Sequence, residues 1–152
     1  MYGEGRRYPR VCVSATIMDA SGRVLVTRRS KKVWYPETWC LPGGHVEGGE
    51  SWIGALRNEV KEEVGLTIKN EILLGIYSDP VLNILPDPVT GEKRCFVSAV
   101  FLVKDFEGGV QITDEISEYG WFFQNEMPEG MIPAEAVKFQ DSFGFKRTPF
   151  VR

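Results

Sequence analysis

Blocks of apolar and β-branched residues alternate with polar, glycine-rich segments along the chain and predict a mixture of strands and helices. Residues 11–19 and 24–28 are rich in valine, isoleucine and leucine and flank the turn-forming segment 20–23, which predicts a β-hairpin. Similar clusters predict strands over 67–76, 94–103 and 119–123.

Helical spacing is clearest over residues 52–64. Ser51 can cap the start of this helix, and Gly65 can end it in a left-handed turn. A second helix is expected over 134–139, with Pro133 at its first position. The apolar positions of the first helix recur at intervals of three and four residues: Ile53, Leu56, Val60 and Val64.

Two segments carry too many prolines and glycines for regular structure. Residues 30–50 and 81–92 are therefore predicted as long loops, and long loops in small domains are often functional. The order of elements predicts a single α+β domain over 1–152, with helices on the faces of a mixed sheet. Strict strand–helix alternation is absent, which argues against a doubly wound dinucleotide-binding fold.

Composition narrows the classes of function. The net charge of −3 leaves no excess of positive charge for binding a DNA duplex. The cysteines Cys12, Cys40 and Cys95 lack metal-binding spacing, and the single His45 cannot complete a zinc site with them. We therefore expect free thiols in a reducing compartment.

Hydrophobic runs are too short for a membrane-spanning helix, which needs about 20 apolar residues. The first ten residues also lack the apolar segment of a signal peptide. We expect a cytoplasmic protein that does not associate with a membrane.

The first helix carries an unusual cluster of glutamates. At about 100° per residue, the apolar stripe covers an arc of about 80°, with Glu63 about 20° and Glu59 about 60° outside it. Glu62 lies further round, and all three are neighbours on one surface. Such carboxylates repel each other unless a cation lies among them, and a hard cation such as Mg²⁺ or Mn²⁺ suits these ligands. The alternative is a solvated acidic face.

The loop before the helix makes the metal-site interpretation the stronger one. From Gly44 to Leu66 the chain reads GHVEGGESWIGALRNEVKEEVGL, which resembles the Nudix box. The preceding Trp39 to Gly44 (WCLPGG) and the later Glu115 to Trp121 (EISEYGW) also resemble segments of that family. The box matches at Gly44, Glu50, Glu59, Val60, Glu62, Glu63, Gly65 and Leu66.

This resemblance implies a Nudix fold, an α/β/α sandwich around a mixed sheet, and hydrolysis of a nucleoside diphosphate linked to another group. By the matching positions, it implies that Glu59, Glu62 and Glu63 bind the metal, together with the carbonyl of Gly44. The catalytic base varies within the family, so the candidates for acid–base work are Glu59, Glu62, Glu115 and Glu118. The resemblance leaves a homodimer open as the assembly.

One position departs from the box: Asn58 stands where the family has an arginine that orients a catalytic glutamate. Asparagine lacks both the charge and the two-pronged geometry of arginine. The neighbouring Arg57 is rotated by about 100° on the helix and is an imperfect substitute. This departure predicts either slower turnover or a site that binds without cutting.

Four residues are candidates for binding substrate. Arg28 and Arg29 end the second predicted strand and could hold phosphates, although they could equally solubilise a strand edge. Trp34 could stack on a base or cover the core, and Arg94 could reach substrate from the strand that it opens. Pro80 lies 14 residues beyond Leu66 and weakly resembles a mark of ADP-ribose pyrophosphatases.

The sequence thus predicts a metal-dependent Nudix hydrolase acting on a nucleoside diphosphate derivative, with ADP-ribose or a nucleotide sugar weakly favoured. One alternative is a house-cleaning (d)NTP pyrophosphatase. Another is a non-catalytic nucleotide-binding Nudix module, which Asn58 motivates. A purely structural protein leaves the glutamate cluster unexplained.

Overall fold

A computed structural model describes residues 8–152 of the chain. Its main sheet has the strand order β11-β6-β8-β1-β4, with β7 pairing on the far end of β8. A second sheet has the order β10-β2-β3, and β5 pairs with β9. In chain order the elements are β1 (Arg10–Ile17), β2 (Val24–Arg29), β3 (Trp39–Cys40), β4 (Gly43–His45), α1 (Trp52–Val64), β5 (Thr67–Lys69), β6 (Ile72–Tyr77), α2 (Pro80–Asn83), β7 (Ile84–Pro86), β8 (Lys93–Val103), β9 (Asp105–Glu107), β10 (Ile116–Phe122), the 3₁₀ turn η1 (Gln124–Glu126), α3 (Pro133–Gly144) and β11 (Phe150–Val151).

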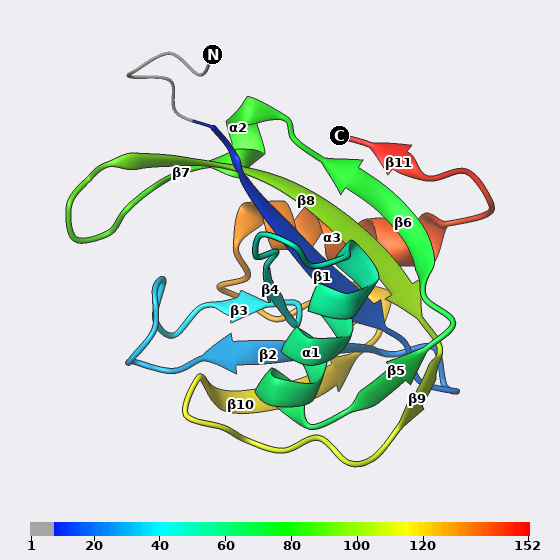
Figure 1. The fold of residues 1–152 in the computed structure, drawn as a ribbon. Helices are drawn as coiled ribbons and strands as arrows, with labels where there is room; N and C mark the ends of the chain where they lie inside the picture. Colours follow the sequence, from blue (N-terminus) through cyan, green and yellow to red (C-terminus); the bar gives the residue numbers. More distant parts are fainter. Residues whose placement is uncertain (1–7) are drawn as a thin grey trace.

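The main sheet is mixed. β1 runs parallel to β8 and antiparallel to β4, while β6 is antiparallel to β8. Helix α1 lies in front of this sheet and α3 behind it (Figure 1). Because both faces of the sheet carry a helix, the predicted α+β class and the α/β/α sandwich are confirmed.

Helix α1 forms as its sequence predicts. The Ser51 side chain accepts a hydrogen bond from the backbone N–H of Gly54, and Gly65 ends the helix with φ of 78°, a conformation that glycine adopts at little cost. The apolar stripe is fully buried at Leu56, Val60 and Val64, against side chains of β1 and β8. Burial of this stripe fixes the direction in which the glutamates of the helix project.

The predicted hairpin over 11–28 forms only at its turn, where Met18 and Val24 make an isolated antiparallel bridge, and the pairing does not continue along the strands. The two strands follow each other through a tight turn in which Asp19 accepts hydrogen bonds from Ser21 and Arg23, but they enter different sheets. β1 is flanked by β8 and β4, and β2 is flanked by β10 and β3. Both strands are largely buried on both faces, so their sequence pattern could not show which partners each would take.

Other boundaries also differ from the sequence prediction. The strand expected over 67–76 is two strands, β5 and β6, because Asn70 takes a left-handed conformation with φ of 55° between them. The loop expected over 81–92 begins instead with α2 and β7, while the 30–50 loop contains the short strands β3 and β4. The predicted strands near 94–103 and 119–123 form as β8 and β10, and α3 extends the predicted second helix to Gly144.

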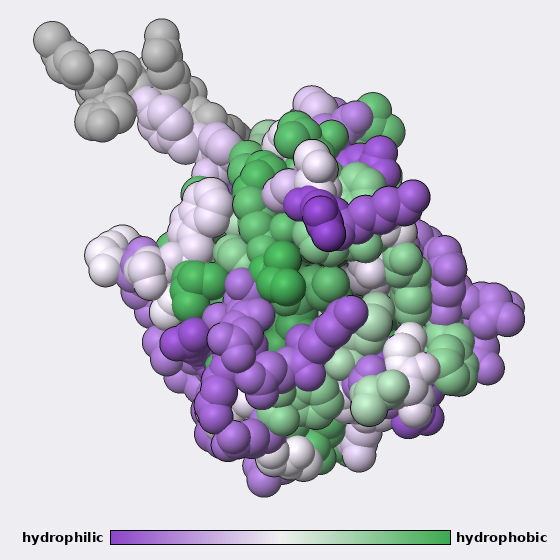
Figure 2. All heavy atoms as spheres, turned by 90° about the vertical axis from the view of Figure 1, so that its right-hand side faces the viewer, coloured by the Kyte–Doolittle hydropathy of each residue, from purple (hydrophilic) through white to green (hydrophobic). Residues whose placement is uncertain are grey.

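Apolar side chains form a band on one side of the molecule. Figure 2, which faces the side carrying β6 and β11, shows this band bordered by hydrophilic side chains. These two strands carry the exposed residues Ile72 and Val151, and Leu73 and Ile76 on β6 are only partly buried against the core. This edge of the main sheet is therefore incompletely covered by the helices.

Within residues 8–152, no helix is long and apolar enough to cross a membrane.

Candidate active site

The three glutamates of α1 face an open cavity of about 200 Å³. Its opposite wall is the loop that precedes β10, which contributes Thr113, Asp114 and Glu115. The structure thus brings Glu115 together with the helix glutamates, although about 50 residues separate them in sequence. The complete lining is Glu59, Glu62, Glu63, Thr113, Asp114 and Glu115.

Hydrogen bonds hold this loop against the helix. The Thr113 hydroxyl donates to the backbone carbonyl of Glu63 at 3.2 Å, and the Ser30 hydroxyl donates to the carbonyl of Asp114 at 2.7 Å. The backbone N–H of Ser30 also donates to the carbonyl of Glu115 at 2.8 Å. Sequence reasoning missed Thr113 and Asp114, and the only local signal was their position beside Glu115.

Glu63 is the most buried carboxyl of the cavity, with 7% of the residue exposed. Burial raises its pKa to about 7, while a hydrogen bond from the backbone N–H of Gly43 and the positive charge of Arg29 oppose the rise. The hydrogen bond joins the Gly43 nitrogen to Oε2 of Glu63 at 3.0 Å. Glu63 therefore ties α1 to β4.

Gly44 lies directly against the carboxylate of Glu59. A Cβ atom added at this glycine would overlap the Glu59 carboxyl group. Burial raises the pKa of Glu59, and the negative charges of Glu62 and Glu115 raise it further. Because glycine has no side chain, the backbone at position 44 can lie close to the Glu59 carboxylate. This carboxylate is also near the negative charges of Glu62 and Glu115.

The donor set fits a hard divalent cation. All candidate side-chain ligands are oxygen atoms, and the backbone of Gly44 lies close to one of these carboxylates, that of Glu59. Among the described residues, no group of three or more Asp, Glu, His or Cys side chains is already arranged to hold a metal. Mg²⁺ suits such an open arrangement because it usually keeps several waters and uses one or two carboxylates together with substrate phosphates.

Arg57 does not replace the arginine that is missing at position 58. Its guanidinium binds both carboxylate oxygens of Glu71, at 2.6 Å and 2.9 Å. Asn58 is exposed, and its side chain makes no hydrogen bond within the described part of the chain. Of the cations named as sequence candidates, Arg29 is the one whose charge acts on Glu63.

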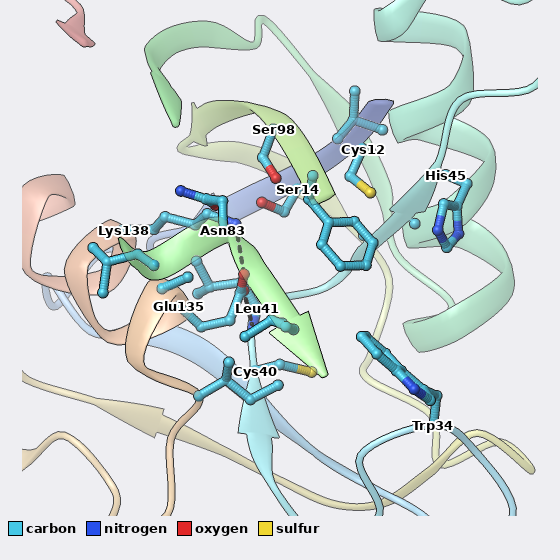
Figure 3. A pocket seen from close by; sticks show the side chains of 18 of the residues that line it. Cys12, Ser14, Trp34, Cys40, Leu41, His45, Asn83, Ser98, Glu135 and Lys138 are labelled. Atoms are coloured by element: carbon cyan, nitrogen blue, oxygen red, sulfur yellow. Dashed lines mark hydrogen bonds and ion pairs between the residues drawn. The ribbon is translucent and has the colours of Figure 1, made fainter. Parts of the chain in front are cut away.

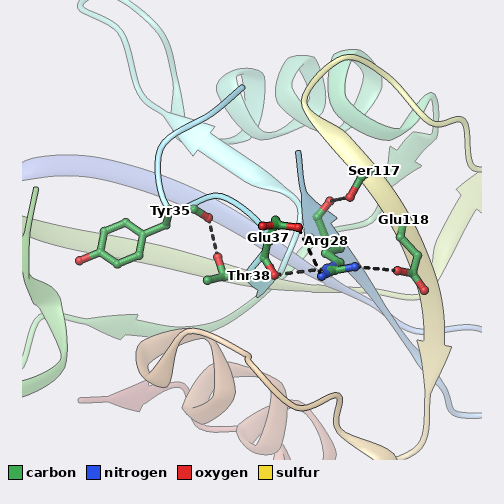
Figure 4. A network of polar contacts seen from close by, with 6 residues as sticks. All are labelled: Arg28, Tyr35, Glu37, Thr38, Ser117 and Glu118. Atoms are coloured by element: carbon green, nitrogen blue, oxygen red, sulfur yellow. Dashed lines mark hydrogen bonds and ion pairs between the residues drawn. The ribbon is translucent and has the colours of Figure 1, made fainter. Parts of the chain in front are cut away.

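Glu118 lies outside the cavity. It is on β10 opposite Arg28 of β2, whose guanidinium lies 3.5 Å from its carboxylate and also donates to the carbonyl of Glu37 at 3.3 Å. Figure 4 shows this surface network, in which Arg28 points toward Glu37 and Glu118. Neither Arg28 nor Glu118 lines either of the two cavities described here.

A second pocket, of about 160 Å³, has all three residues of β4 in its lining (Figure 3). Gly43 and Gly44 line it, so the same short strand borders both this pocket and the glutamates. Most of its wall is apolar, and we refer to it as the aromatic pocket. Its lining residues are Cys12, Val13, Ser14, Arg29, Trp34, Cys40, Leu41, Gly43, Gly44, His45, Leu82, Asn83, Leu85, Phe96, Ser98, Ile132, Ala134, Glu135 and Lys138.

Two of the sequence candidates for substrate binding, Arg29 and Trp34, line the aromatic pocket, and a third supports it. Arg94 does not line the pocket; its guanidinium lies 5.3 Å from the Trp34 ring and pairs with Asp87 at 2.5 Å. The Trp34 ring also lies 5.7 Å from that of Phe96. Arg94 thus holds the tryptophan in place from outside the pocket.

Two of the three cysteines are protected by the pocket wall, which predicts a clear pattern of thiol reactivity. Burial raises the pKa of Cys12 to about 11 and that of Cys40 to about 12, whereas Cys95 is exposed. Because the thiolate is the reactive form, we expect iodoacetamide at pH 8 to modify Cys95 and to spare the other two. Mass spectrometry of tryptic peptides would measure this, and Cys95→Ser is expected to remove the labelling. Comparable labelling of Cys40 in the native protein would contradict the pKa direction.

Together, the fold and site define an α/β/α domain that carries an acidic helix beside a glycine loop. The NUDIX domain family matches residues 8–143. The chain therefore belongs to the Nudix hydrolase family, and the resemblance seen in the sequence is confirmed.

Relatives agree with this assignment. The crystal structure of a MutT NUDIX hydrolase from Burkholderia pseudomallei superposes with a TM-score of 0.74 at 28% identity, covering 89% of this chain and 98% of that one. A MutT-like protein from Streptomyces ambofaciens is 27% identical over 132 residues, which is 87% of this chain and 75% of that protein. An m7GpppN-mRNA hydrolase, NUDT17, from Xenopus laevis is 42% identical over 60 residues, or 39% of this chain. The chain spans about a fifth of the length of the first curated relatives that it matches.

Proposed function

We propose that this domain hydrolyses the pyrophosphate linkage of a nucleoside diphosphate derivative in the presence of Mg²⁺ or Mn²⁺. The observation that carries the proposal is the position of β4. Gly43 and Gly44 line the aromatic pocket and also contact Glu63 and Glu59, two of the glutamates that line the cavity. A nucleotide with its base in the pocket would extend its phosphates across these glycines toward the carboxylates.

The residues proposed to hold the cation are Glu59, Glu62 and Glu63, with the carbonyl of Gly44. When bound, such a cation supplies positive charge that neutralises the phosphates and makes a water molecule more acidic. The chain itself must then orient the phosphates and accept a proton. Glycines at β4 let the backbone approach the phosphates closely, and Arg29 is a cation near Glu63 that could bind them.

Two carboxylates are our candidates for accepting the proton of the attacking water. Glu115 and Glu62 line the glutamate cavity from opposite walls, whereas Glu118 pairs with Arg28 outside it. We therefore favour Glu115 or Glu62 over Glu118 as the base, because a base must lie within hydrogen-bonding reach of the proton that it accepts. The homodimer that the sequence left open stays a prediction.

A substrate panel tests the proposed function. The purified chain is incubated with nucleotide sugars, ADP-ribose, dinucleoside polyphosphates and (d)NTPs, with Mg²⁺, with Mn²⁺ or with chelator. We expect metal-dependent release of a nucleoside monophosphate and a sugar phosphate from the nucleoside diphosphate derivatives. Release of pyrophosphate from (d)NTPs would instead support the pyrophosphatase alternative, and chelator-resistant turnover would contradict the metal site.

A non-catalytic nucleotide-binding module is the second candidate. Asn58 is exposed and Arg57 is occupied by Glu71, so neither supplies the orienting charge that the family arginine provides. This candidate predicts saturable nucleotide binding with no turnover of any compound in the panel. Metal-dependent turnover that Glu62→Gln abolishes would exclude it.

A further inference from the structure

One end of the aromatic pocket gathers four buried polar side chains that the proposed hydrolysis does not explain, and at the other end Nε1 of Trp34 is buried without a hydrogen-bond partner among the described residues. Figure 3 shows the hydroxyls of Ser14 and Ser98 pointing toward the end where Lys138 and Asn83 lie, while Trp34 and His45 lie on the opposite side of the pocket. Ser14, Ser98, Asn83 and Lys138 are each at least 93% buried. Four polar side chains gathered in so small and apolar a space require partners of their own.

Ser14 is the first sign that these partners belong to a ligand. Its Oγ is buried and has no hydrogen-bond partner in the described structure. Buried hydroxyl groups almost always have a partner, because an unpaired one costs free energy. The Ser14 hydroxyl lines the pocket, so a bound molecule can supply what the protein does not.

Lys138 is the second sign. The residue is 3% exposed, and its Nζ atom donates to Oε1 of Glu135 at 2.6 Å. The other oxygen of Glu135 accepts the backbone N–H of Leu41 at 3.1 Å, so this carboxylate is already used on both sides. An ammonium group has three N–H donors. The Lys138 ammonium also lies 5.9 Å from the centre of the Tyr77 ring, but within residues 8–152 it makes no second hydrogen bond, which leaves N–H donors available to the pocket.

Asn83 supplies the complementary acceptor. Its amide nitrogen donates to the backbone carbonyl of Asp79 at 3.0 Å, and this bond fixes which way the amide points. The amide oxygen makes no hydrogen bond among the described residues and is left to accept one from a ligand. The polar end therefore combines a cationic donor, two hydroxyls and a carbonyl acceptor.

We propose that this pocket recognises the lactam edge of a nucleobase, that is, a ring carbonyl next to a ring N–H. The carbonyl would accept from Lys138, and the ring N–H would donate to the amide oxygen of Asn83. Guanine, hypoxanthine and uracil present this edge. Adenine and cytosine present an amino group beside an unprotonated ring nitrogen, which would place N–H against the ammonium. The flat apolar walls suit either ring size.

This inference rests on the proposed function for its choice of a nucleotide as ligand, and it selects among the substrates proposed above. It makes guanosine, inosine and uridine diphosphate derivatives better substrates than ADP-ribose. A site built to hydrogen-bond one base edge binds other bases weakly, because their edges leave the polar groups of the site unpaired.

Matched nucleoside monophosphates test the inference without any turnover. IMP differs from AMP, and UMP from CMP, only at the proposed edge. Calorimetric titration of the full chain is expected to show IMP binding at least about tenfold more tightly than AMP, or UMP more tightly than CMP. The pair with the larger ratio identifies the ring size. Equal binding within each pair, tighter binding of AMP and CMP, or no saturable binding would overturn the proposal.

Substitutions test whether Lys138 and its neighbours cause the preference for IMP over AMP. Lys138→Met is expected to reduce the IMP to AMP ratio to within about twofold of unity, while Lys146→Met, an exposed lysine beyond α3, keeps it. If the loss of Lys138 unfolds the protein by leaving Glu135 unpaired, Asn83→Ala, which removes the proposed acceptor of the ring N–H, replaces it as the test and is expected to lower the ratio severalfold. Unchanged ratios in the folded variants would overturn the assignment. Selective binding in a chain that cleaves nothing would contradict the proposed hydrolysis alone.

Discussion

Glu62→Gln is expected to lower metal-stimulated turnover by at least about 100-fold while the protein stays folded. Glu62 is exposed on α1 and lines the glutamate cavity, so glutamine keeps the shape and helix propensity of the side chain but removes its charge. Loss of a cation ligand or of a catalytic base lowers the rate by roughly 100-fold to 10,000-fold. Initial rates with saturating Mg²⁺ and the preferred substrate of the panel would measure the loss.

The matched control for this variant is Glu107→Gln. Glu107 is exposed on β9 and pairs with Lys69 at 2.7 Å, and it lines neither cavity. The rate of the Glu107→Gln variant is therefore expected to stay within about twofold of that of the unaltered protein.

Glu115→Gln and Glu118→Gln belong in the same series of variants. Geometry predicts the larger loss for Glu115. Retention of more than about a third of the activity by Glu62→Gln would show that the cavity does not perform the chemistry.

The helix and its glutamates could be predicted from the sequence because both depend on local geometry. The spacing of apolar residues predicted α1 over 52–64, and the structure has the same bounds. Once the helix is known, its 100° rotation per residue determines which side of it Glu59, Glu62 and Glu63 occupy. Ser51 and Gly65 act as caps for equally local reasons.

Strand partners could not be predicted in the same way. β1 and β2 look like a hairpin because a turn joins two apolar strands, but pairing is decided by contacts with segments distant in sequence. β1 pairs with β8 along its whole length, more than 80 residues away. Both β1 and β2 are largely buried on both faces, so alternation of residue types gave no information on sheet membership.

The aromatic pocket escaped sequence reasoning because its polar end is assembled from β1, α2, β8 and α3. Weak signals existed. Ser14 and Ser98 lie among mostly apolar residues of their strands, and Lys138 is a charged residue on the buried side of α3. A polar residue inside a buried element must find a partner, so such residues indicate either a buried network or a binding site. Choosing between these required the unpaired Ser14 hydroxyl, which only the structure shows.

Gly44→Ala is expected to reduce turnover by about 100-fold with little loss of stability. The new methyl group would meet the carboxyl end of Glu59, a flexible side chain that can move aside. Moving it displaces a proposed cation ligand, and misplacement of a reacting group by about 1 Å can cost about 100-fold in rate. We expect the free energy of unfolding to change by less than about 1 kcal/mol, because no backbone atom is displaced. Initial rates and urea denaturation would measure the two quantities.

Alanine substitutions at two nearby glycines serve as controls. They test whether the loss of activity is specific to position 44 or follows from any added side chain in this loop. Gly48 has no atom within 4 Å of an added Cβ, so Gly48→Ala is expected to keep both activity and stability. Gly43 would place its Cβ against the backbone of Val13 and Ser14 in β1, so Gly43→Ala is expected to destabilise the fold itself. Only position 44 should lose activity without losing stability. If Gly44→Ala and Gly48→Ala had equal rates, contact between Gly44 and Glu59 would have no part in catalysis.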